Sequence, residues 1–526
     1  MDLKQMLRSM TLEQKIGQLI IAGFETPQPD DPHFLKLVNE YHVGNIILFT
    51  RNLGSRNEVA QLTQAIRNTI MDDCGVPPFI VCDQEGGMVT RIFHAGNVVP
   101  GAMATGATYD PENAYKIGKI VGQEMRALGM NFNYAPCVEE ALFRTPSNIS
   151  VRAYSDNPFM VALFCNAFVA GLQEQGVIAT LKHFPGYTGV LEDAHLEIPT
   201  NVRSRHELEK VELAAFQQVI DGGADAVMTG FLKCPALVPD GGLTAASYEV
   251  MTGLLKEKMG FEGIVSSDCM DMRGLLDAYG ADRGAVALIK AGVHVLCISH
   301  NLSTQATACD GLREAVLSGE IPMEQLDEIV LHILRFKEKY HLFEEKPIAE
   351  RLASVDWEEN RRICERISED SVTLVRGGEL LPLKGKGLFI STKPMTLVIV
   401  DEKVEAGDTF AHAAAQRFGG ESRVIGLNPT DEEIEALTQA AKGKDYVVLG
   451  TYNAFCNEGQ QKLQQALLRA NPKLISVALR ASYDYDCAQD VPCLILTYEY
   501  TKNAIRSVLR VLGGEREATG VAPVRL

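Results

Sequence analysis

The sequence lacks the features that mark secreted, membrane-spanning and disulfide-bonded proteins. No run approaches the ~18 uninterrupted apolar residues that a bilayer span needs. The N-terminal segment has no cationic stretch followed by a cleavable apolar one, so no signal peptide is expected. The 12 cysteines are dispersed and form no C-x-x-C pair. We therefore expect a cytoplasmic protein with reduced cysteines and no membrane partner.

Positive charge and tryptophan are also scarce. The 68 acidic residues outnumber the 50 basic ones and give a formal charge of −18, which repels a phosphate backbone and argues against nucleic acid as a partner. The one tryptophan, Trp357, leaves Tyr and Phe to supply any aromatic platform for a ligand. No Gly-rich dinucleotide fingerprint, Walker sequence or H-E-x-x-H occurs, so neither a cofactor nor a bound metal is expected.

What is present is enough apolar sequence for two domains. A chain of 526 residues, 46% hydrophobic, exceeds the ~250–300 residues at which a single core stops growing. Over residues 1–343, short β-branched runs alternate with longer amphipathic stretches, a pattern that predicts a (β/α)8 TIM barrel. The eight strands are expected within residues 16–24, 43–49, 77–85, 130–136, 177–184, 224–231, 263–270 and 293–299.

A second, smaller domain is expected after a linker at residues 344–355, which contains Pro347. Residues 356–526 repeat the α/β pattern and predict a doubly wound α/β sandwich domain with a parallel sheet, whose role is to pack against or cover the barrel. Its strands are expected at residues 396–401, 422–427, 446–453, 474–480 and 493–499.

Polar residues recur where the predicted barrel strands end. Asp83 and Glu85 end the third strand, Asn133 the fourth, Lys182 and His183 the fifth, and Asp268 the seventh. In TIM barrels the chemistry lies at the carboxyl ends of the strands. These side chains are therefore predicted to converge on one active site.

Two clusters of residues suggest acid/base and nucleophilic chemistry. In the segment LKHFPGYTGVLEDAH, Asp193 is placed to orient His195, and an imidazole supported by a carboxylate exchanges protons near neutral pH. Asp268 at a strand end is a suitable nucleophile for an anomeric carbon, whereas Asp271 is expected to bind within its loop.

Two arginines complete the predicted site. Arg91 lies in DQEGGMVTR and Arg152 in SNISVRAY, and both can donate planar hydrogen-bond forks to sugar oxygens.

Taken together, the segments resemble glycoside hydrolase family 3, in particular its β-N-acetylglucosaminidase branch. The resemblance covers about the first 340 residues in order, through DQEGG, PGAMATGAT, NFNYAP, SVRAYSDNP, KHFPG, the D-x-H ending, VMTG and SSDCMDM, and more loosely the second domain. It implies a retaining exo-β-N-acetylhexosaminidase that takes an oligosaccharide or a cell-wall muropeptide.

The resemblance also implies roles for individual residues. Asp268 is the nucleophile, and His195, oriented by Asp193, is the acid/base. The non-reducing sugar is held by Asp83, Arg91, Arg152, Lys182 and His183.

The sequence departs from the family pattern at four positions. Met88 stands where an arginine commonly follows the double glycine, Tyr187 and Phe231 replace polar residues, and His294 replaces an aspartate. Three alternatives therefore stay open. They are a glycoside phosphorylase that uses phosphate in place of water, a metal-dependent hydrolase with His183, Asp193 and His195 as ligands, and a sugar-binding barrel without catalysis.

Overall fold

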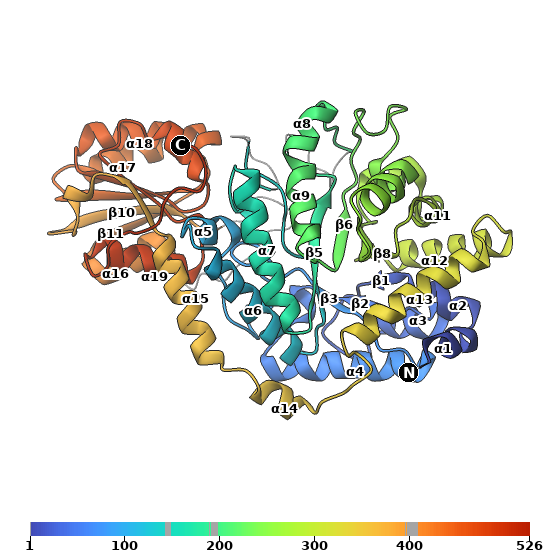
Figure 1. Ribbon diagram of the computed structural model, residues 1–526. Helices are drawn as coiled ribbons and strands as arrows, with labels where there is room; N and C mark the ends of the chain where they lie inside the picture. The colour runs from blue at the N-terminus through green and yellow to red at the C-terminus, as the bar shows by residue number, and fades with distance from the viewer. Residues whose placement is uncertain (1, 143–148, 189, 191–197, 395, 397–408) are drawn as a thin grey trace.

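The N-terminal part of the chain is a closed barrel of eight parallel strands that neighbour one another in chain order (Figure 1). The computed structural model describes residues 2–142, 149–188, 190, 198–394, 396 and 409–526. The strands are β1 Ile20–Ala22, β2 Asn45–Ile47, β3 Ile80–Cys82, β4 Phe132–Asn133, β5 Ile178–Phe184, β6 Ala226–Thr229, β7 Ile264–Cys269 and β8 Val295–Ile298. Each lies inside a segment predicted to be a strand, which confirms the barrel.

Helices surround the barrel, so its strands are buried on both faces. All residues of β1, β2 and β3 are buried, which is why these strands appear in the sequence as continuous apolar runs. The α-helices described in this part are α1 Leu3–Ser9, α2 Leu12–Gln18, α3 Pro32–Tyr41, α4 Arg56–Cys74, α5 Ala102–Gly106, α6 Pro111–Ala127, α7 Pro158–Glu174, α8 Arg205–Lys210, α9 Glu212–Asp221, α10 Arg273–Tyr279, α11 Ala281–Ala291, α12 Leu302–Leu317 and α13 Met323–Lys339. A π-helix, Glu249–Lys258, lies between β6 and β7.

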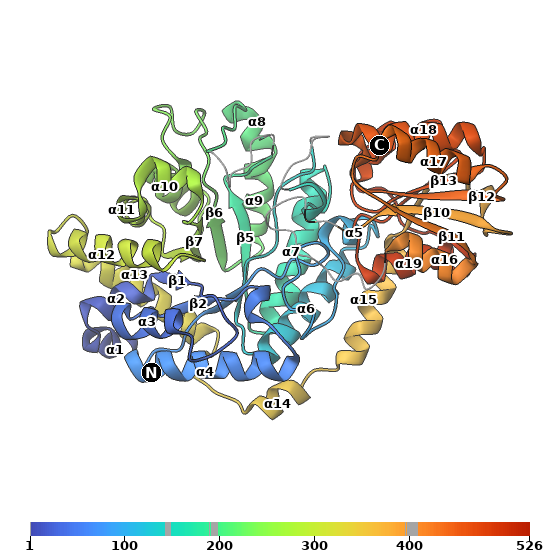
Figure 2. The same ribbon diagram turned by 180° about the vertical axis from the view of Figure 1, so that it is seen from behind.

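The second domain is built on a six-stranded sheet in the order β11-β10-β12-β13-β14-β9. Its strands are β9 Thr373–Arg376, β10 Gly387–Thr392, β11 Gly420–Ile425, β12 Tyr446–Thr451, β13 Leu474–Ala478 and β14 Cys493–Leu496. Figure 2 shows α16 (Phe410–Phe418) and α19 (Lys502–Leu512) on one face, with α17 (Asp431–Ala441) and α18 (Glu458–Ala470) on the other. This arrangement confirms the α/β sandwich.

The sheet is mixed, so the prediction of a parallel sheet was wrong at one edge. β9 pairs with β14 in the antiparallel direction. Strand β10, which follows β9 in the chain, runs parallel to β14. Only the short helical turn Gly378–Leu380 lies between β9 and β10, so no helix returns the chain to the other end of the sheet, and β9 runs in the opposite direction. The strand predicted at 396–401 lies outside the described residues except for Thr396, and neither β9 nor β10 was predicted.

One helix joins the two domains. The predicted linker, residues 344–355, contains α14 (Ile348–Ala353), and α15 (Trp357–Ser371) follows it. On α15, Asn360 donates to Glu124 of the barrel helix α6 at 3.2 Å, and Glu365 accepts from Arg506 of α19 at 2.6 Å. Trp357 stacks against the guanidinium of Arg56, 3.5 Å from the ring centroid.

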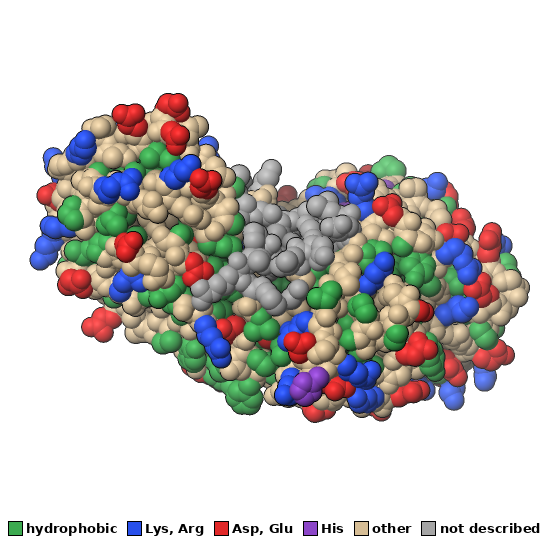
Figure 3. All heavy atoms as spheres, turned by 90° about the horizontal axis from the view of Figure 1, so that it is seen from above, with side chains coloured by type: hydrophobic (Ala, Val, Ile, Leu, Met, Phe, Trp, Pro, Cys, Tyr) green, Lys and Arg blue, Asp and Glu red, His purple; other side chains and the backbone are tan. Residues whose placement is uncertain are grey.

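Two surface properties follow from the described residues. No helix among them is both long enough and apolar enough to cross a bilayer. On the face shown in Figure 3, acidic and basic side chains are interspersed over both domains.

His294, one of the four departures, lies buried just before β8 beside a lysine. Its Nδ1 accepts the backbone N–H of Val265 at 3.1 Å, and its Nε2 is 2.7 Å from Nζ of Lys256. The proton of the neutral ring is therefore on Nε2, where only an uncharged amine can accept it. Burial lowers the pKa of Lys256 to about 8, and burial with the nearby Lys256 charge lowers the pKa of His294 well below its usual value.

Both shifts make the fold sensitive to acid. A base whose pKa is lower in the folded state binds its proton more tightly in the unfolded state. The free energy of unfolding therefore decreases as the pH falls below the unfolded pKa. For Lys256 this loss continues down to about pH 8, and for His294 it begins below about pH 6.5. His294→Asp replaces the contact with an ion pair. We expect its melting temperature to exceed that of the wild type by roughly 2–4 °C at pH 5.5 and by less at pH 9, measured by calorimetry. The same change at the exposed His206 is the control, and an equal gain at both pH values contradicts the explanation.

Candidate active site

A buried carboxylate joins three of the predicted site residues. Glu85, two residues beyond Asp83, accepts from Arg152 through both oxygens at 2.7 and 2.8 Å and from Nζ of Lys182 at 2.7 Å. Lys182 also bonds to Asp83 Oδ1 at 2.9 Å. Lys182 comes from β5, Glu85 from the loop after β3, and Arg152 from the helical turn Ser150–Arg152. The structure therefore brings Asp83, Arg152 and Lys182 together.

The charges in this group fix one another's ionisation. Burial opposes the charged form of Glu85, but Arg152 and Lys182 hold the pKa of its carboxyl far below its usual value. Burial likewise acts against the Lys182 ammonium, and Asp83 and Glu85 outweigh it and raise the pKa of that group. Fixed charges at a strand end present an ordered set of donors and acceptors to a polar ligand. Asp83 is 17% exposed, so it can reach such a ligand.

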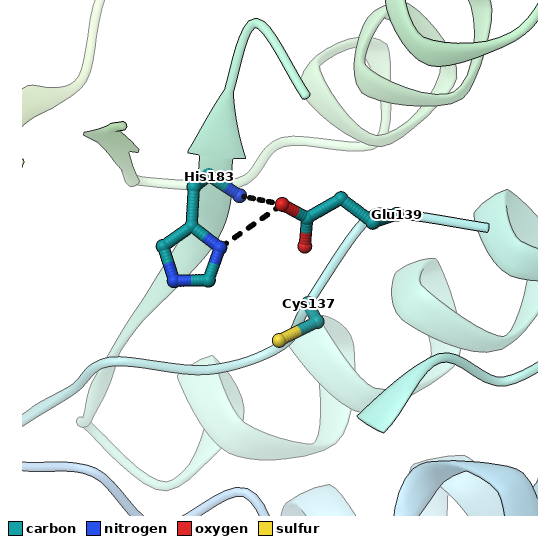
Figure 4. A group of neighbouring side chains, drawn as sticks. All are labelled: Cys137, Glu139 and His183. Carbon is teal, nitrogen blue, oxygen red and sulfur yellow. Dashed lines mark hydrogen bonds and ion pairs between the residues drawn. The ribbon is translucent and has the colours of Figure 1, made fainter. Parts of the chain in front are cut away.

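His183 faces a second buried carboxylate. Glu139 Oε1 accepts from the backbone N–H of His183 and lies 3.0 Å from its Nδ1 (Figure 4). Burial alone would raise the pKa of Glu139, but the charge and the hydrogen bonds of His183 hold it below its usual value. The pair fixes the orientation of the imidazole at the end of β5. The Sγ atom of Cys137 lies in the same group (Figure 4).

Asp268 lies in β7, one residue before the strand ends. Its Oδ1 accepts the backbone N–H of Cys269 at 2.7 Å. Burial, then Cys269, and more weakly Asp83 and Asp268 raise the pKa of the buried Cys297 thiol, so both carboxylates lie within electrostatic reach of Cys297.

Asp271 ties two loops together. It accepts from the backbone N–H of His300 at 2.8 Å and from Asn301 Nδ2 at 2.9 Å, which joins the β7 loop to the β8 loop. Bonding within its own loop was expected for Asp271; there the structure shows a 3.8 Å contact from Cys269 Sγ, and the shorter bonds go to the β8 loop.

The remaining predicted site residues are Asp193, His195 and Arg91. Asp193 and His195 lie outside the described residues. Arg91 is buried; its backbone N–H donates to Gln84 Oε1 at 2.9 Å, and its guanidinium lies 6.0 Å from the ring centroid of Phe49. These contacts hold the segment after β3 in place.

Two of the departures, Tyr187 and Phe231, belong to a single contact. The hydroxyl of Tyr187 accepts the backbone N–H of Phe231 at 2.8 Å, and its ring packs edge-on against His183 with centroids 5.2 Å apart. A Cβ on Gly230 would lie 2.7 Å from the Tyr187 ring, so this packing requires glycine there. The substitutions at 187, 230 and 231 are thus coupled by packing.

Met88, where the resemblance leads one to expect an arginine, is buried in the apolar core that the second domain shares with the neighbouring barrel loops. The adjacent loop is held by Glu499 of the second domain, whose Oε2 accepts the backbone N–H of Gly101 at 2.7 Å. These contacts confirm that the second domain packs against the barrel.

A third carboxylate lies under the loop that follows β5. Glu140 Oε2 accepts from the Thr188 hydroxyl at 2.9 Å, and Thr188 Oγ1 accepts the backbone N–H of Glu140 at 3.2 Å. Burial and then the nearby Glu212 raise the pKa of Glu140 to about 8. Glu212, which pairs with Arg203 at 2.9 Å, has a pKa raised by burial to about 7.

Sequence reasoning named Glu85 at a strand end without assigning it a role, and it missed Glu139 and Glu140. All three follow strands β3 and β4, so the strand-end rule could have found them. The segment APCVEE gave no chemical signal by itself, because its partners lie in β5 and in the loop after it.

Comparisons with known proteins agree with the fold. Residues 11–336 match the glycosyl hydrolase family 3 N terminal domain. A glycoside hydrolase family 3 β-N-acetylglucosaminidase from Paenibacillus sp. str. FPU-7 superposes with a TM-score of 0.92 at 35% identity, over 98% of this chain and 99% of the other.

Two relatives in sequence are β-hexosaminidases. The enzyme of Xanthomonas euvesicatoria pv. vesicatoria is 36% identical over 291 residues, 53% of this chain and 84% of its own. β-Hexosaminidase A of Pseudoalteromonas piscicida is 27% identical over 414 residues, 71% of this chain and 69% of its own.

Replacing Glu85 by alanine should destabilise the barrel, because it removes the buried carboxylate that pairs with both Arg152 and Lys182. Breaking a buried ion pair from one side costs about 3–5 kcal/mol of unfolding free energy. Denaturant titration followed by circular dichroism measures the loss. The control is Glu320→Ala, which breaks pairs to the exposed Arg283 and Lys290 and should cause no resolvable change. Equal losses for the two variants contradict the prediction.

Replacing Glu140 by glutamine should stabilise the protein increasingly as the pH rises. A carboxyl whose pKa is near 8 when folded, above its unfolded value, binds its proton more tightly in the folded state, so wild-type stability falls between about pH 5 and 8. Glutamine does not titrate. The difference in unfolding free energy should grow with pH by at most about 1.4 kcal/mol per unit. The exposed Glu257→Gln is the control, and a difference independent of pH sinks the assignment.

Proposed function

This chain belongs to glycosyl hydrolase family 3, and from that membership we propose that it is a retaining, exo-acting β-N-acetylhexosaminidase that releases terminal N-acetylglucosamine. The observation that carries the proposal is the agreement with the Paenibacillus β-N-acetylglucosaminidase over both domains, at 35% identity. Both sequence relatives described above are β-hexosaminidases as well. A glycoside hydrolase acts on carbohydrate, and the charged group around Glu85 suits a ligand rich in hydroxyls.

In the proposed site Asp83, Lys182 and Arg152 hold the hydroxyls of the non-reducing sugar. His183 and Arg91 complete the sugar-binding group. Lys182 and Arg152 are themselves held by Glu85, so their donors are oriented before the sugar binds. Such preorganisation supports tight positioning of the anomeric carbon, because the protein groups need little rearrangement.

The reaction proceeds in two steps. Asp268 attacks C1 of the sugar while His195, oriented by Asp193, protonates the leaving oxygen, which gives a glycosyl ester on Asp268. His195 then takes a proton from water, the water oxygen attacks C1, and the ester bond breaks to release a sugar of retained configuration. The position of Asp268 near the end of β7 supports its role, because its side chain is held by the backbone N–H of Cys269.

We place the enzyme in the cytoplasm, acting on muropeptides or related oligosaccharides in cell-wall recycling. The state of the cysteines supports this location: all 12 lie in the described residues and none forms a disulfide, as in a reducing compartment.

Asp268→Asn should lose roughly 10³-fold or more in kcat, because the amide cannot form the glycosyl ester. The assay follows nitrophenol release from 4-nitrophenyl β-N-acetylglucosaminide and β-glucoside, each with and without phosphate. We expect turnover of the acetamido sugar alone, with no phosphate requirement. Asp271→Asn is the matched control, since Asp271 bonds to His300 and Asn301 and should retain far more activity.

Two of the alternatives, the phosphorylase and the sugar-binding barrel, have their own outcomes in this assay. Formation of a sugar phosphate at the expense of free sugar identifies a phosphorylase. Turnover of neither sugar supports a binding barrel. Wild-type rates in Asp268→Asn refute the proposed nucleophile.

A further inference from the structure

The chain after β4 runs alongside the end of β5. The backbone of Cys137 bridges to that of Lys182, and the N–H of Val138 donates to the Lys182 carbonyl at 2.8 Å. Along an extended segment, side chains two residues apart point to the same side. Cys137 and Glu139 therefore both face His183 (Figure 4).

These three side chains form a compact group of metal-ligand atoms. One atom from each lies within 4.8 Å of the other two, and all three residues are buried. Glu139 Oε1 and His183 Nδ1 are 3.0 Å apart. Two ligands bound to zinc at about 2.0–2.1 Å with a tetrahedral angle lie roughly 3.3 Å apart, so this pair is already close to the required spacing.

One oxygen of Glu139 has unused bonding capacity. Oε1 is bonded to His183, whereas the buried Oε2 accepts no hydrogen bond from any residue in the described part of the chain. Buried carboxylate oxygens without a donor are rare, because burial removes the water that would otherwise solvate them. A cation at this position would satisfy the oxygen.

The local charge also favours a cation. Asp83, Glu85 and Glu139 carry three negative charges, and Lys182 and Arg152 carry two positive ones. The group has one net negative charge with a neutral imidazole and two once the Cys137 thiol is ionised. A divalent ion balances that charge.

We propose that Cys137, Glu139 and His183 bind a thiophilic divalent cation of the Zn²⁺ class, and that the bound ion inhibits the enzyme. Thiolate, imidazole and carboxylate together favour Zn²⁺ or Co²⁺, whereas Mg²⁺ and Ca²⁺ take oxygen ligands. On binding, the ion forms bonds to Sγ of Cys137, a ring nitrogen of His183 and a carboxylate oxygen of Glu139. The S–H bond breaks and its proton passes to water, and the proton that Nδ1 of His183 donates to Glu139 moves to Nε2 so that Nδ1 can bind the ion; no oxidation state changes.

The inhibition part of this inference rests on the proposed function. His183 follows Lys182 in β5 and lies in the proposed sugar-binding group, so an ion that holds its imidazole removes a sugar contact. The ion would compete with the sugar. The site differs from the metal-dependent hydrolase considered from the sequence, because here the ion blocks the reaction and takes no part in it.

Co²⁺ titration of the reduced, chelator-treated full-length protein tests the binding. A thiolate ligand gives an intense near-ultraviolet charge-transfer absorption, and we expect one equivalent of Co²⁺ to produce it. Cys137→Ala should abolish the band. Cys165→Ala is the matched control: Cys165 is another buried cysteine, whose Sγ donates to the Cys137 carbonyl at 3.3 Å, and its loss should leave the band unchanged. A missing band in the wild type, or a band retained in Cys137→Ala, overturns the site.

A rate assay with added Zn²⁺ tests the inhibition. Zn²⁺ should raise KM for the nitrophenyl N-acetylglucosaminide in the wild type and in Cys165→Ala. Cys137→Ala should turn over substrate like the wild type and need at least tenfold more Zn²⁺ for the same effect. Equal Zn²⁺ sensitivity in all three proteins refutes the inhibition. If the protein cleaves neither sugar, the proposed function fails, while the Co²⁺ titration still decides the metal site.

Discussion

The carboxylate of Glu85 is the contact on which the proposed sugar-binding group depends. It is buried, and it holds cations that come from two other parts of the chain, Lys182 of β5 and Arg152 of the turn before α7. A buried charge without a partner is strongly unfavourable, so each member of this group needs the others. The loop after β3, the end of β5 and the turn at Arg152 are consequently fixed relative to one another.

The second domain supports the same loops from outside the barrel. Met88 lies in the apolar core shared with that domain, and Glu499 accepts the N–H of Gly101 beside the Gly86–Gly87 turn. Burial raises the pKa of Glu499 to about 7. The second domain thus positions the segment that carries Asp83 and Glu85, which accounts for methionine where the family pattern has an arginine.

The packing of Tyr187 against Gly230 and Phe231 shows how two residues that depart from the expected pattern, Tyr187 and Phe231, fit into the structure. The Tyr187 ring occupies the space that a side chain at 230 would need, and its hydroxyl satisfies the backbone N–H of Phe231. The edge-on contact with His183 then gives the proposed site a more apolar wall on the side of β5 and β6. His294 differs from these residues, because its buried contact with Lys256 costs stability in acid.

The sequence by itself determined the eight barrel strands, their chain order and the strand-end positions of Asp83, Lys182, His183 and Asp268. These features depend on local periodicity and on the rule that barrel chemistry follows the strands, and both can be seen in short segments. Tertiary structure alone decided which charges pair. Lys182 bonds to Asp83, which lies 99 positions away in the sequence, and Gly101 bonds to Glu499, which lies 398 positions away. The direction of β9, the burial of Met88 and the meeting of Cys137, Glu139 and His183 were decided in the same way, because segments far apart in sequence become neighbours only when the barrel closes and the domains pack.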